Sequence, residues 1–284
     1  MKPSSFDYTK PDSIDEALAL LSSREGQVAV LAGGQSLMPT LNMRLSSPTL
    51  LIDINGLEEL SGISFSGKTL RIGALTRHRA VENSDDVAQH TPLIKMAMPH
   101  IAHPAIRNRG TIGGSVALAD PAAELPACLC ALEAEIEIVG NKGRRKVAAE
   151  KFFRDLFQTD LAEDELLTAV EIPGLADGYR SAFQELARRH GDYAMTGLAA
   201  HAKVDGDMVS DLRLAYFAVG RTPVLAKNGA EAAEGKKVDH ELITSVQSAL
   251  EKDLDPFDDL HCSAAVKMLY AKELASRTLK ALIE

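Results

Sequence analysis

The chain has 284 residues, of which 45% are hydrophobic and 25% charged, enough for a substantial core shared by two or three domains. Its net charge of −9, with no tryptophan and no basic stripe, disfavours a nucleic-acid partner. No segment approaches the roughly 20 apolar residues of a membrane span, and the first residues lack the apolar core of a signal peptide, so we expect a cytoplasmic protein.

The first 57 residues have the pattern of a helix, a strand, a glycine turn, a helix and a second strand. Residues 13–21 predict an amphipathic helix with Ser13 as N-cap and Glu16 completing a capping box. Residues 28–31 and 50–54 predict buried strands, and residues 36–44 predict the helix between them. The glycine turn matches neither the G-x-G-x-x-G fingerprint nor a P-loop, so neither nucleotide-binding fold is indicated.

The next region, to about residue 177, predicts strands at 69–74, 134–139 and 170–172, with a turn at 140–143 and a helical stretch at 76–101. Residues 126–132 are apolar and predict a buried helix, so Cys128 and Cys130 are interpreted as buried structural thiols. Three cysteines are too few for an iron–sulfur cluster, which would therefore need another polypeptide. From about residue 178 we expect a strand at 212–219 and helices at 239–250 and 262–282.

Two glycine pairs are the most informative feature. The first lies in Ala32–Pro39 and the second in Arg107–Ser115. Polar residues follow each pair directly, Gln35 and Ser36 after the first and Ser115 after the second. A residue without Cβ lets consecutive N–H groups turn toward a phosphate, so the two segments predict loops that approach one large anionic ligand. A single Gly-Gly pair is more often a plain turn. Arg107 and Arg109 are candidates for neutralising a phosphate, with ion-paired or solvated arginines as the equal alternative.

Other combinations of reactive residues predict no site. His100 and His103 have a spacing open to zinc, but no third ligand follows in register and Pro104 interrupts, so no metal site is expected. A hydrolase is disfavoured because the chain has no G-x-S-x-G motif. Arg188 and Arg189 are interpreted as structural or as part of a subunit contact.

Five segments in order along the chain resemble the FAD-binding medium subunits of molybdenum hydroxylases, the family of the carbon monoxide dehydrogenase medium subunit and the xanthine dehydrogenase flavin domain. The matching segments are residues 32–39, 106–115, 119–126, 164–173 and 188–193, the last reading Arg-Arg-His-Gly-Asp-Tyr. The chain departs from many relatives at Gln35, at Ser115 and at Gln184–Glu185, where they carry histidine, asparagine and lysine.

The resemblance implies an α+β fold in three parts. A FAD-binding domain of the vanillyl-alcohol-oxidase-like type would comprise a small α/β subdomain at residues 1–57 and a larger subdomain with a mixed or antiparallel sheet at residues 58–177. A C-terminal α+β domain with a small antiparallel sheet and helices would follow at residues 178–284.

The resemblance also implies roles for individual residues. Gly33, Gly34, Gln35 and Ser36 would hold the FAD diphosphate from one side, with Leu31, Ala32 and Leu37 packed around it, and Thr111, Gly113, Gly114 and Ser115 would hold it from the other. Glu124 would accept from the adenosine ribose, and Ile101, Ala102 and Leu167 would pack on the flavin and adenine faces. Tyr193 would lie near the isoalloxazine.

By this resemblance the chain is the FAD subunit of a heterotrimeric molybdenum hydroxylase. Substrate would be oxidised on a large molybdopterin subunit, and electrons would pass through [2Fe-2S] clusters on a small subunit to FAD and an external acceptor, in a dimer of heterotrimers. No residue of this chain would be catalytic toward the substrate. Two alternatives are a self-contained FAD-dependent oxidase or reductase, and a non-catalytic assembly protein that purifies without colour.

Overall fold

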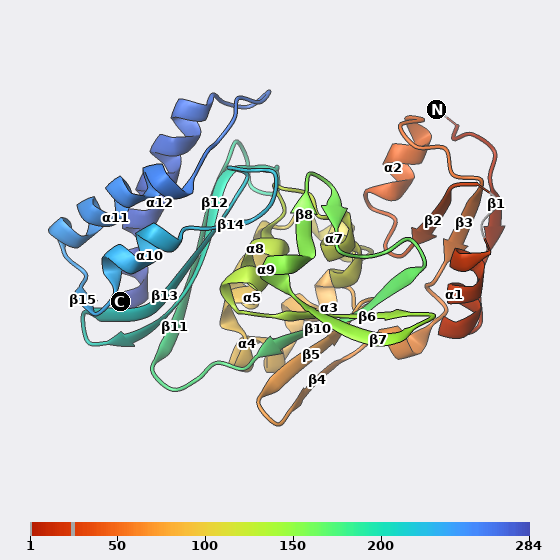
Figure 1. Ribbon diagram of the computed structural model, residues 1–284, viewed down its shortest axis with the longest axis horizontal. Coiled ribbons are helices and arrows are strands. Elements are labelled where there is room, and N and C mark those ends of the chain that lie inside the picture. Colours follow the sequence, from red (N-terminus) through yellow and green to blue (C-terminus); the bar gives the residue numbers. More distant parts are fainter. Residues whose placement is uncertain (1, 24–25) are drawn as a thin grey trace.

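The computed structural model describes residues 2–23 and 26–284 and arranges them as three units side by side (Figure 1). The amino-terminal unit has a parallel sheet in the order β1-β3-β2. Its strands are β1 (Asp7–Thr9), β2 (Val28–Leu31) and β3 (Leu50–Asp53), and its helices are α1 (Ile14–Ser22) and α2 (Leu37–Asn42). A short 3₁₀ helix, η1 (Glu58–Leu60), leads out of it. The predicted strand, turn, helix and strand are confirmed.

The predicted cap of α1 is confirmed in one half only. The Ser13 hydroxyl accepts from the Glu16 N–H at 3.1 Å, as an N-cap should. The Glu16 carboxylate, however, accepts from the N–H of Asp12 at 2.8 Å and not from that of Ser13, so the reciprocal bond of a capping box is shifted by one residue.

The middle unit is built on an antiparallel sheet in the order β4-β5-β10-β6-β7. Its strands are β4 (Ile63–Ser66), β5 (Thr69–Gly73), β6 (Glu135–Gly140), β7 (Gly143–Ala148) and β10 (Glu165–Pro173). A small hairpin, β8 (Phe153–Asp155) with β9 (Gln158–Thr159), stands beside it. The strands predicted at 69–74, 134–139 and 170–172 are all present. The first two are β5 and β6, each with ends that differ from the prediction by one residue, and the third lies within the longer strand β10.

The helical stretch predicted at 76–101 is wrong as a single helix, because it is divided into short pieces. These are α3 (His78–Asn83), α4 (Asp85–His90), α5 (Pro92–Ala97) and the 3₁₀ turn η2 (Met98–His100). Ser84 starts α4 by accepting from the Val87 N–H, and Pro92 opens α5, so the chain restarts at each of these residues. The remaining helices of this unit are α6 (Pro104–Arg107), α7 (Ile112–Leu118), α8 (Glu124–Ala131) and α9 (Ala149–Phe152).

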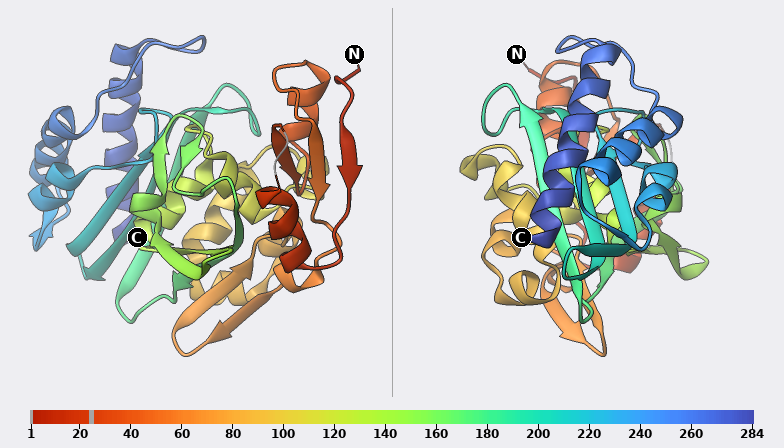
Figure 2. Two further views of the ribbon diagram at one scale, coloured as in Figure 1. Left: turned by 45° about the vertical axis from the view of Figure 1, so that its right-hand side comes forward. Right: turned by 90° about the vertical axis from the view of Figure 1, so that its left-hand side faces the viewer.

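The carboxy-terminal unit is a second antiparallel sheet with helices on its outer face (Figures 1 and 2). Its strands are β11 (Tyr179–Ala187), β12 (Ala194–Asp205), β13 (Met208–Phe217), β14 (Val224–Leu225) and β15 (Lys236–Lys237). Its helices are α10 (Lys227–Ala233), α11 (His240–Asp253) and α12 (Ala264–Ile283). The strand predicted at 212–219 is β13, which begins four residues earlier, and both predicted helices are present.

The two large units share a core. Helix α8 is buried along its whole length, with Cys128 and Cys130 inside as predicted, and it contacts the inner face of β12 and β13. Phe183 and Phe217 of that inner face belong to the same hydrophobic cluster as the middle unit. Helices α10, α11 and α12 cover the outer face with a separate cluster. The C-terminal sheet is therefore buried on both faces, and the α+β prediction is confirmed.

Candidate cofactor-binding site

The two glycine loops lie against each other. A Cβ placed on Gly33 would sit 2.5 Å from the backbone oxygen of Arg109 and 2.9 Å from the Cα of Gly110. No side chain fits at such distances, so the first loop can approach the second this closely only with glycine at position 33. The predicted convergence of two segments distant in sequence is confirmed.

The first loop presents a run of backbone donors. Gly34 has φ +70°, a conformation that favours glycine, and the loop runs directly into α2. The Gln35 side chain turns back and donates to the carbonyl of Gly33 at 3.0 Å. Within the described ranges, the N–H groups of residues 33–37 have no hydrogen-bond acceptor. These N–H groups are available to an anion.

The second loop uses its glycines differently from the prediction. The N–H groups of residues 112–115 are already bonded, to the carbonyls of Thr76, Ala74 and Thr111 and to the Thr111 hydroxyl that caps α7. A Cβ on Gly113 would lie 2.5 Å from that of Ala74, so this glycine is needed for close packing against the residue that follows β5. The second loop therefore offers a ligand its surface and hydroxyls, while consecutive free N–H groups come only from the first.

A cavity of about 560 Å³ lies between the three units. This is within the usual range for small-molecule sites, about 300–1,000 Å³. All but one of the residues expected to hold FAD line it: Ala32, Gly33, Gly34, Gln35, Ser36, Leu37, Ile101, Ala102, Thr111, Gly113, Gly114, Ser115, Glu124, Leu167 and Tyr193. Leu31 instead lines an adjoining cavity of about 380 Å³, which shares residues 32–35 with the larger one.

The carboxy-terminal unit closes one side of the cavity with the Gly191–Tyr193 loop. Gly191 has φ +84°, and a Cβ there would lie 2.8 Å from the carbonyl oxygen of Ala102. This contact joins the loop to the Ile101–Ala102 segment of the middle unit, so both segments line one cavity. Tyr193 is 65% exposed and lies at the edge of the cavity.

Buried carboxyl groups cluster beside the cavity near α8. Burial raises the pKa of Glu124 to about 7 and that of Glu185 to about 8. A neighbouring carboxylate raises each further, that of Asp120 for Glu124 and that of Glu124 for Glu185. The Glu185 side chain is 2% exposed, and its Oε2 has no hydrogen-bond partner among the described residues, although His100 Nδ1 lies 3.7 Å away. Burial lowers the pKa of His100, so this contact joins neutral groups at neutral pH and is no ion pair.

The raised pKa of Glu185 predicts a loss of stability as pH rises. Between 4.5, its ordinary value, and about 8, the unfolded carboxyl ionises while the folded one keeps its proton, so the free energy of unfolding falls. Glu185→Gln removes this titration and should stabilise the chain, relative to wild type, by roughly 3 kcal/mol more at about pH 8 than at about pH 5. Urea unfolding at both pH values measures it. Equal pH dependence in wild type and variant would refute the prediction, and Glu58→Gln, at an exposed glutamate, is the control.

Several cavity residues were not predicted from the sequence. His78 is one: it is 5% exposed, burial lowers its pKa to about 4, and its Nδ1 would lie 3.0 Å from a Cβ on Gly110. A neutral imidazole therefore packs against Gly110 of the second loop. Asp120, Leu161 and Glu165 also line the cavity. A lone histidine in a helical stretch gives no sequence signal for this place, whereas Asp120 lies in a segment that carries the family resemblance.

The arginines beside the second loop have different roles. Arg107 is buried, pairs with Glu82 at 3.1 Å, and donates to the carbonyls of Ile101 and Ala102, so it is the ion-paired alternative. Arg109 lines the smaller cavity. Arg188 donates to the carbonyl of His261.

Among the residues that the structure describes, no group of three or more His, Cys, Asp or Glu side chains is placed to hold a metal.

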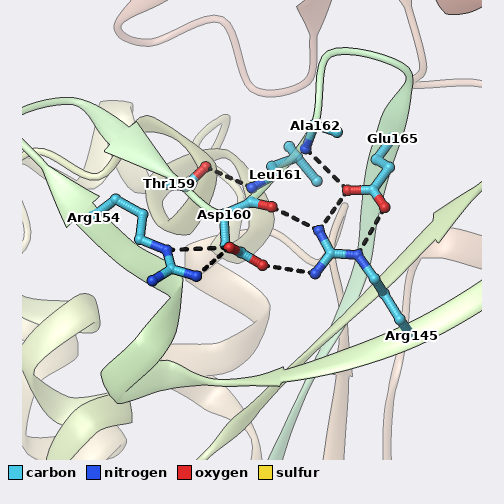
Figure 3. A network of polar contacts seen from close by, with 7 residues as sticks. All are labelled: Arg145, Arg154, Thr159, Asp160, Leu161, Ala162 and Glu165. Atoms are coloured by element: carbon cyan, nitrogen blue, oxygen red, sulfur yellow. Dashed lines mark hydrogen bonds and ion pairs between the residues drawn. The ribbon is translucent and has the colours of Figure 1, made fainter.

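An arginine network holds the cavity wall contributed by residues 161–165 (Figure 3). Arg145 binds both oxygens of Glu165, at 2.7 and 2.6 Å, and also the Asp160 carboxylate at 2.7 Å. Arg154 pairs with the other oxygen of Asp160. Paired bonds of this kind fix direction as well as distance, so the segment before β10 is held in place while Leu161 and Glu165 line the cavity.

Comparisons with known proteins agree with this arrangement. Residues 4–175 match the model of the FAD binding domain in molybdopterin dehydrogenase, and residues 181–282 match the CO dehydrogenase flavoprotein C-terminal domain. No helix in the described parts of the chain is long and apolar enough to cross a membrane.

Individual relatives match over nearly the whole chain. The chain is 39% identical to the 6-hydroxypseudooxynicotine dehydrogenase complex subunit alpha of Paenarthrobacter nicotinovorans, over 98% of this chain and 95% of that one. It is 36% identical to the carbon monoxide dehydrogenase medium chain of Hydrogenophaga pseudoflava, over 99% and 98%. A solved structure of carbon monoxide dehydrogenase from that organism, lacking the Mo-pyranopterin moiety, superposes with a TM-score of 0.96 at 37% identity, over 99% of this chain and 98% of that one.

Proposed function

Because the chain belongs to the family of FAD-binding medium subunits of molybdenum hydroxylases, we propose that it carries electrons from [2Fe-2S] clusters on a small subunit through FAD to an external acceptor. Substrate is oxidised on a large molybdopterin subunit. The three chains assemble as a dimer of heterotrimers in the cytoplasm. Bound FAD supplies one- and two-electron transfer, and the protein supplies its position and electrostatic surroundings.

One observation carries the FAD part of the proposal: residues 33–37, whose N–H groups have no acceptor in the described protein, line the same cavity as the second glycine loop. A diphosphate bridge has the negative oxygens that such N–H groups bind. Thr111 and Ser115 approach the same group from the other side. Gly33 fits this role because any Cβ would separate the two loops.

The rest of the cavity suits the two ends of the cofactor. Ile101, Ala102 and Leu167 offer apolar surface for flat rings. Glu124, with a pKa of about 7, can donate or accept a hydrogen bond at neutral pH, so it suits a ribose hydroxyl. Tyr193 is proposed to lie beside the isoalloxazine from its place at the cavity edge.

Substrate choice is proposed to lie on another chain. The names of two relatives that match this chain almost equally well refer to 6-hydroxypseudooxynicotine and to carbon monoxide, molecules that share no recognition chemistry. One flavin-holding chain can serve both if substrate never contacts it. The same reasoning leaves this chain without a residue that is catalytic toward the substrate.

The proposal predicts that the full chain, expressed alone, binds about one FAD, and that it co-purifies with an iron–sulfur chain and a molybdenum chain when all three are expressed together. Flavin absorbance and metal analysis measure both. In the complex, substrate should reduce the flavin, whereas the chain alone should not be reduced by NAD(P)H or by small organic substrates. A colourless chain that takes up no FAD would refute the proposal, and flavin reduction without partners would favour the self-contained enzyme.

A further inference from the structure

A chain of polar side chains links the two glycine loops outside the larger cavity, and two of its members, Asp53 and Asn55, line the smaller one. It starts at Asp53, at the end of β3, whose Oδ2 accepts from the Tyr8 hydroxyl at 2.6 Å. The Asp53 Oδ1 accepts from Asn55 twice, from its backbone N–H at 2.9 Å and from its side-chain Nδ2 at 2.6 Å. These bonds fix the direction of the Asn55 amide.

Asn55 holds the first loop. Its Nδ2 also donates to the carbonyl oxygen of Ala32 at 2.7 Å, immediately before the Gly33–Gly34 pair. Its remaining acceptor, Oδ1, receives a bond from the Arg77 guanidinium at 2.6 Å. The amide thus uses both of its ends, one on the loop and one on the arginine.

Arg77 carries the link to the second loop. One of its terminal nitrogens bonds Asn55, and the other donates to the carbonyl oxygen of Arg109, immediately before Gly110. The backbone of Arg77 also forms an isolated antiparallel bridge with Thr111. A guanidinium keeps its charge in proteins and presents its donors in a rigid fork, so it can set a distance between two acceptors.

This link spans a joint between two separate sheets. The first loop follows β2 of the amino-terminal sheet, and the second loop belongs to the middle unit, with no strand pairing between the two sheets in the described residues. Contact between Gly33 and the Arg109–Gly110 backbone limits how closely the loops approach. The Asn55–Arg77 link limits how far they separate.

Two guanidinium groups and one carboxylate, those of Arg77, Arg109 and Asp53, interact at the joint. Burial and the neighbouring charge of Arg109 lower the pKa of Arg77, the effect expected when two guanidinium groups lie close together, while Asp53 offsets this only in part. An anion between the loops would relieve the repulsion.

We propose that Asn55 and Arg77 form a clamp that sets the spacing of the two glycine loops and thereby the affinity of the chain for the diphosphate of its cofactor. Both are positioning residues. Arg77 lines neither cavity, and Asn55 lines only the smaller one, beside Gly33 and Gly34. This inference rests on the proposed FAD binding. It assigns to two residues of the joint an effect on cofactor affinity that acts through the spacing of the two loops.

The test is FAD binding by the full chain carrying Arg77→Met, which keeps most of the side-chain volume and removes both bonds. We expect the Kd for FAD to rise about tenfold or more, because a charge-assisted bond to each loop is lost. Arg77→Lys keeps the charge but carries its donors on a single nitrogen, which cannot reproduce the fork to both loops, and should give an intermediate loss. In Asn55→Ala,Arg77→Met the loss should barely exceed the larger single loss, because both residues serve one link.

Two further measurements separate a clamp from a general structural role. ADP, which has a diphosphate, should lose affinity by the same factor as FAD, while riboflavin, which has none, should bind as it does to wild type. The melting temperature of the FAD-free variant should stay within about 2 °C of wild type. Arg277→Met, which removes an exposed pair with Glu273 on α12, is the control and should leave FAD binding unchanged.

The clamp is refuted if Arg77→Met binds FAD within about twofold of wild type, or if riboflavin loses as much affinity as ADP. If Arg77→Met does not fold, Arg77→Lys decides in the same way, with unchanged ADP affinity as the refuting result. If wild type itself binds no FAD, the proposed function fails; if wild type binds FAD and the variants bind it equally well, only the clamp fails.

Discussion

Gly33→Ala is expected to yield a folded chain that loses FAD during purification. The new Cβ would lie 2.5 Å from the Arg109 backbone oxygen and 2.9 Å from the Gly110 Cα, and neither atom is the end of a flexible side chain that could turn away. The loops must separate, at a cost of about 1–3 kcal/mol that binding would have to overcome. We therefore expect the Kd for FAD to rise roughly 10- to 100-fold. Equilibrium titration by flavin fluorescence measures it.

Gly56→Ala is the matched control for this experiment. It lies in the same amino-terminal unit, and a Cβ there would meet only the end of the Lys10 side chain, which can move aside. This variant should bind FAD as wild type does. If Gly33→Ala bound FAD with unchanged affinity, contact between the loops would have no part in holding the cofactor. If both variants lost FAD equally, the effect would belong to the amino-terminal unit as a whole.

The first glycine loop was the part of the molecule most open to prediction. A β-branched run at residues 28–31, a glycine pair and a second apolar run at residues 50–54 are each local signals, and together they fix strand, turn, helix and strand. The convergence with the second loop followed from chemistry shared by two distant segments. The roles of individual residues toward FAD stay predictions.

The second loop shows where such reasoning stops. The sequence suggested that both glycine pairs present free N–H groups to a phosphate. The N–H groups of residues 112–115 are instead bonded to the protein, and position 113 requires glycine because Ala74 lies so close. Ala74 lies far from Gly113 in sequence, so no local pattern announces the contact. The same holds for Arg107, whose partner Glu82 belongs to a separate helix.

Strands β11 and β12 escaped prediction for a related reason. Both faces of this sheet are covered, by the middle unit on one side and by α10–α12 on the other, so the alternation of apolar and polar residues that marks a half-exposed strand is missing. Four of the 12 residues of β12 are alanine, a residue with weak strand preference. Packing between units, and not local propensity, makes this segment a strand.

The largest loss of stability is expected from Gly197→Ala in β12. Gly197 pairs with Phe217 across to β13, and a Cβ there would lie 1.9 Å from the end of the phenyl ring. Phe217 is fully buried and stacks on Phe183 at 5.7 Å, while Phe183 also contacts the His100 ring, so the ring has no free direction in which to turn. Gly197 therefore leaves the space that the Phe217 ring occupies at the junction of the two large units.

Gly197→Ala should lower the free energy of unfolding by about 3 kcal/mol, the upper part of the usual range for overpacking. The melting temperature should fall by roughly 6–12 °C. Calorimetry of the full chain measures it. Phe217→Leu replaces the ring with a shorter side chain. It should restore part of the loss when combined with Gly197→Ala, although it is destabilising on its own. Phe217→Leu would thus destabilise the wild-type chain but stabilise the Gly197→Ala variant. Such a change of sign is specific to a steric clash. Additive losses would mean that Gly197 is required for its backbone and not for the space it leaves to Phe217.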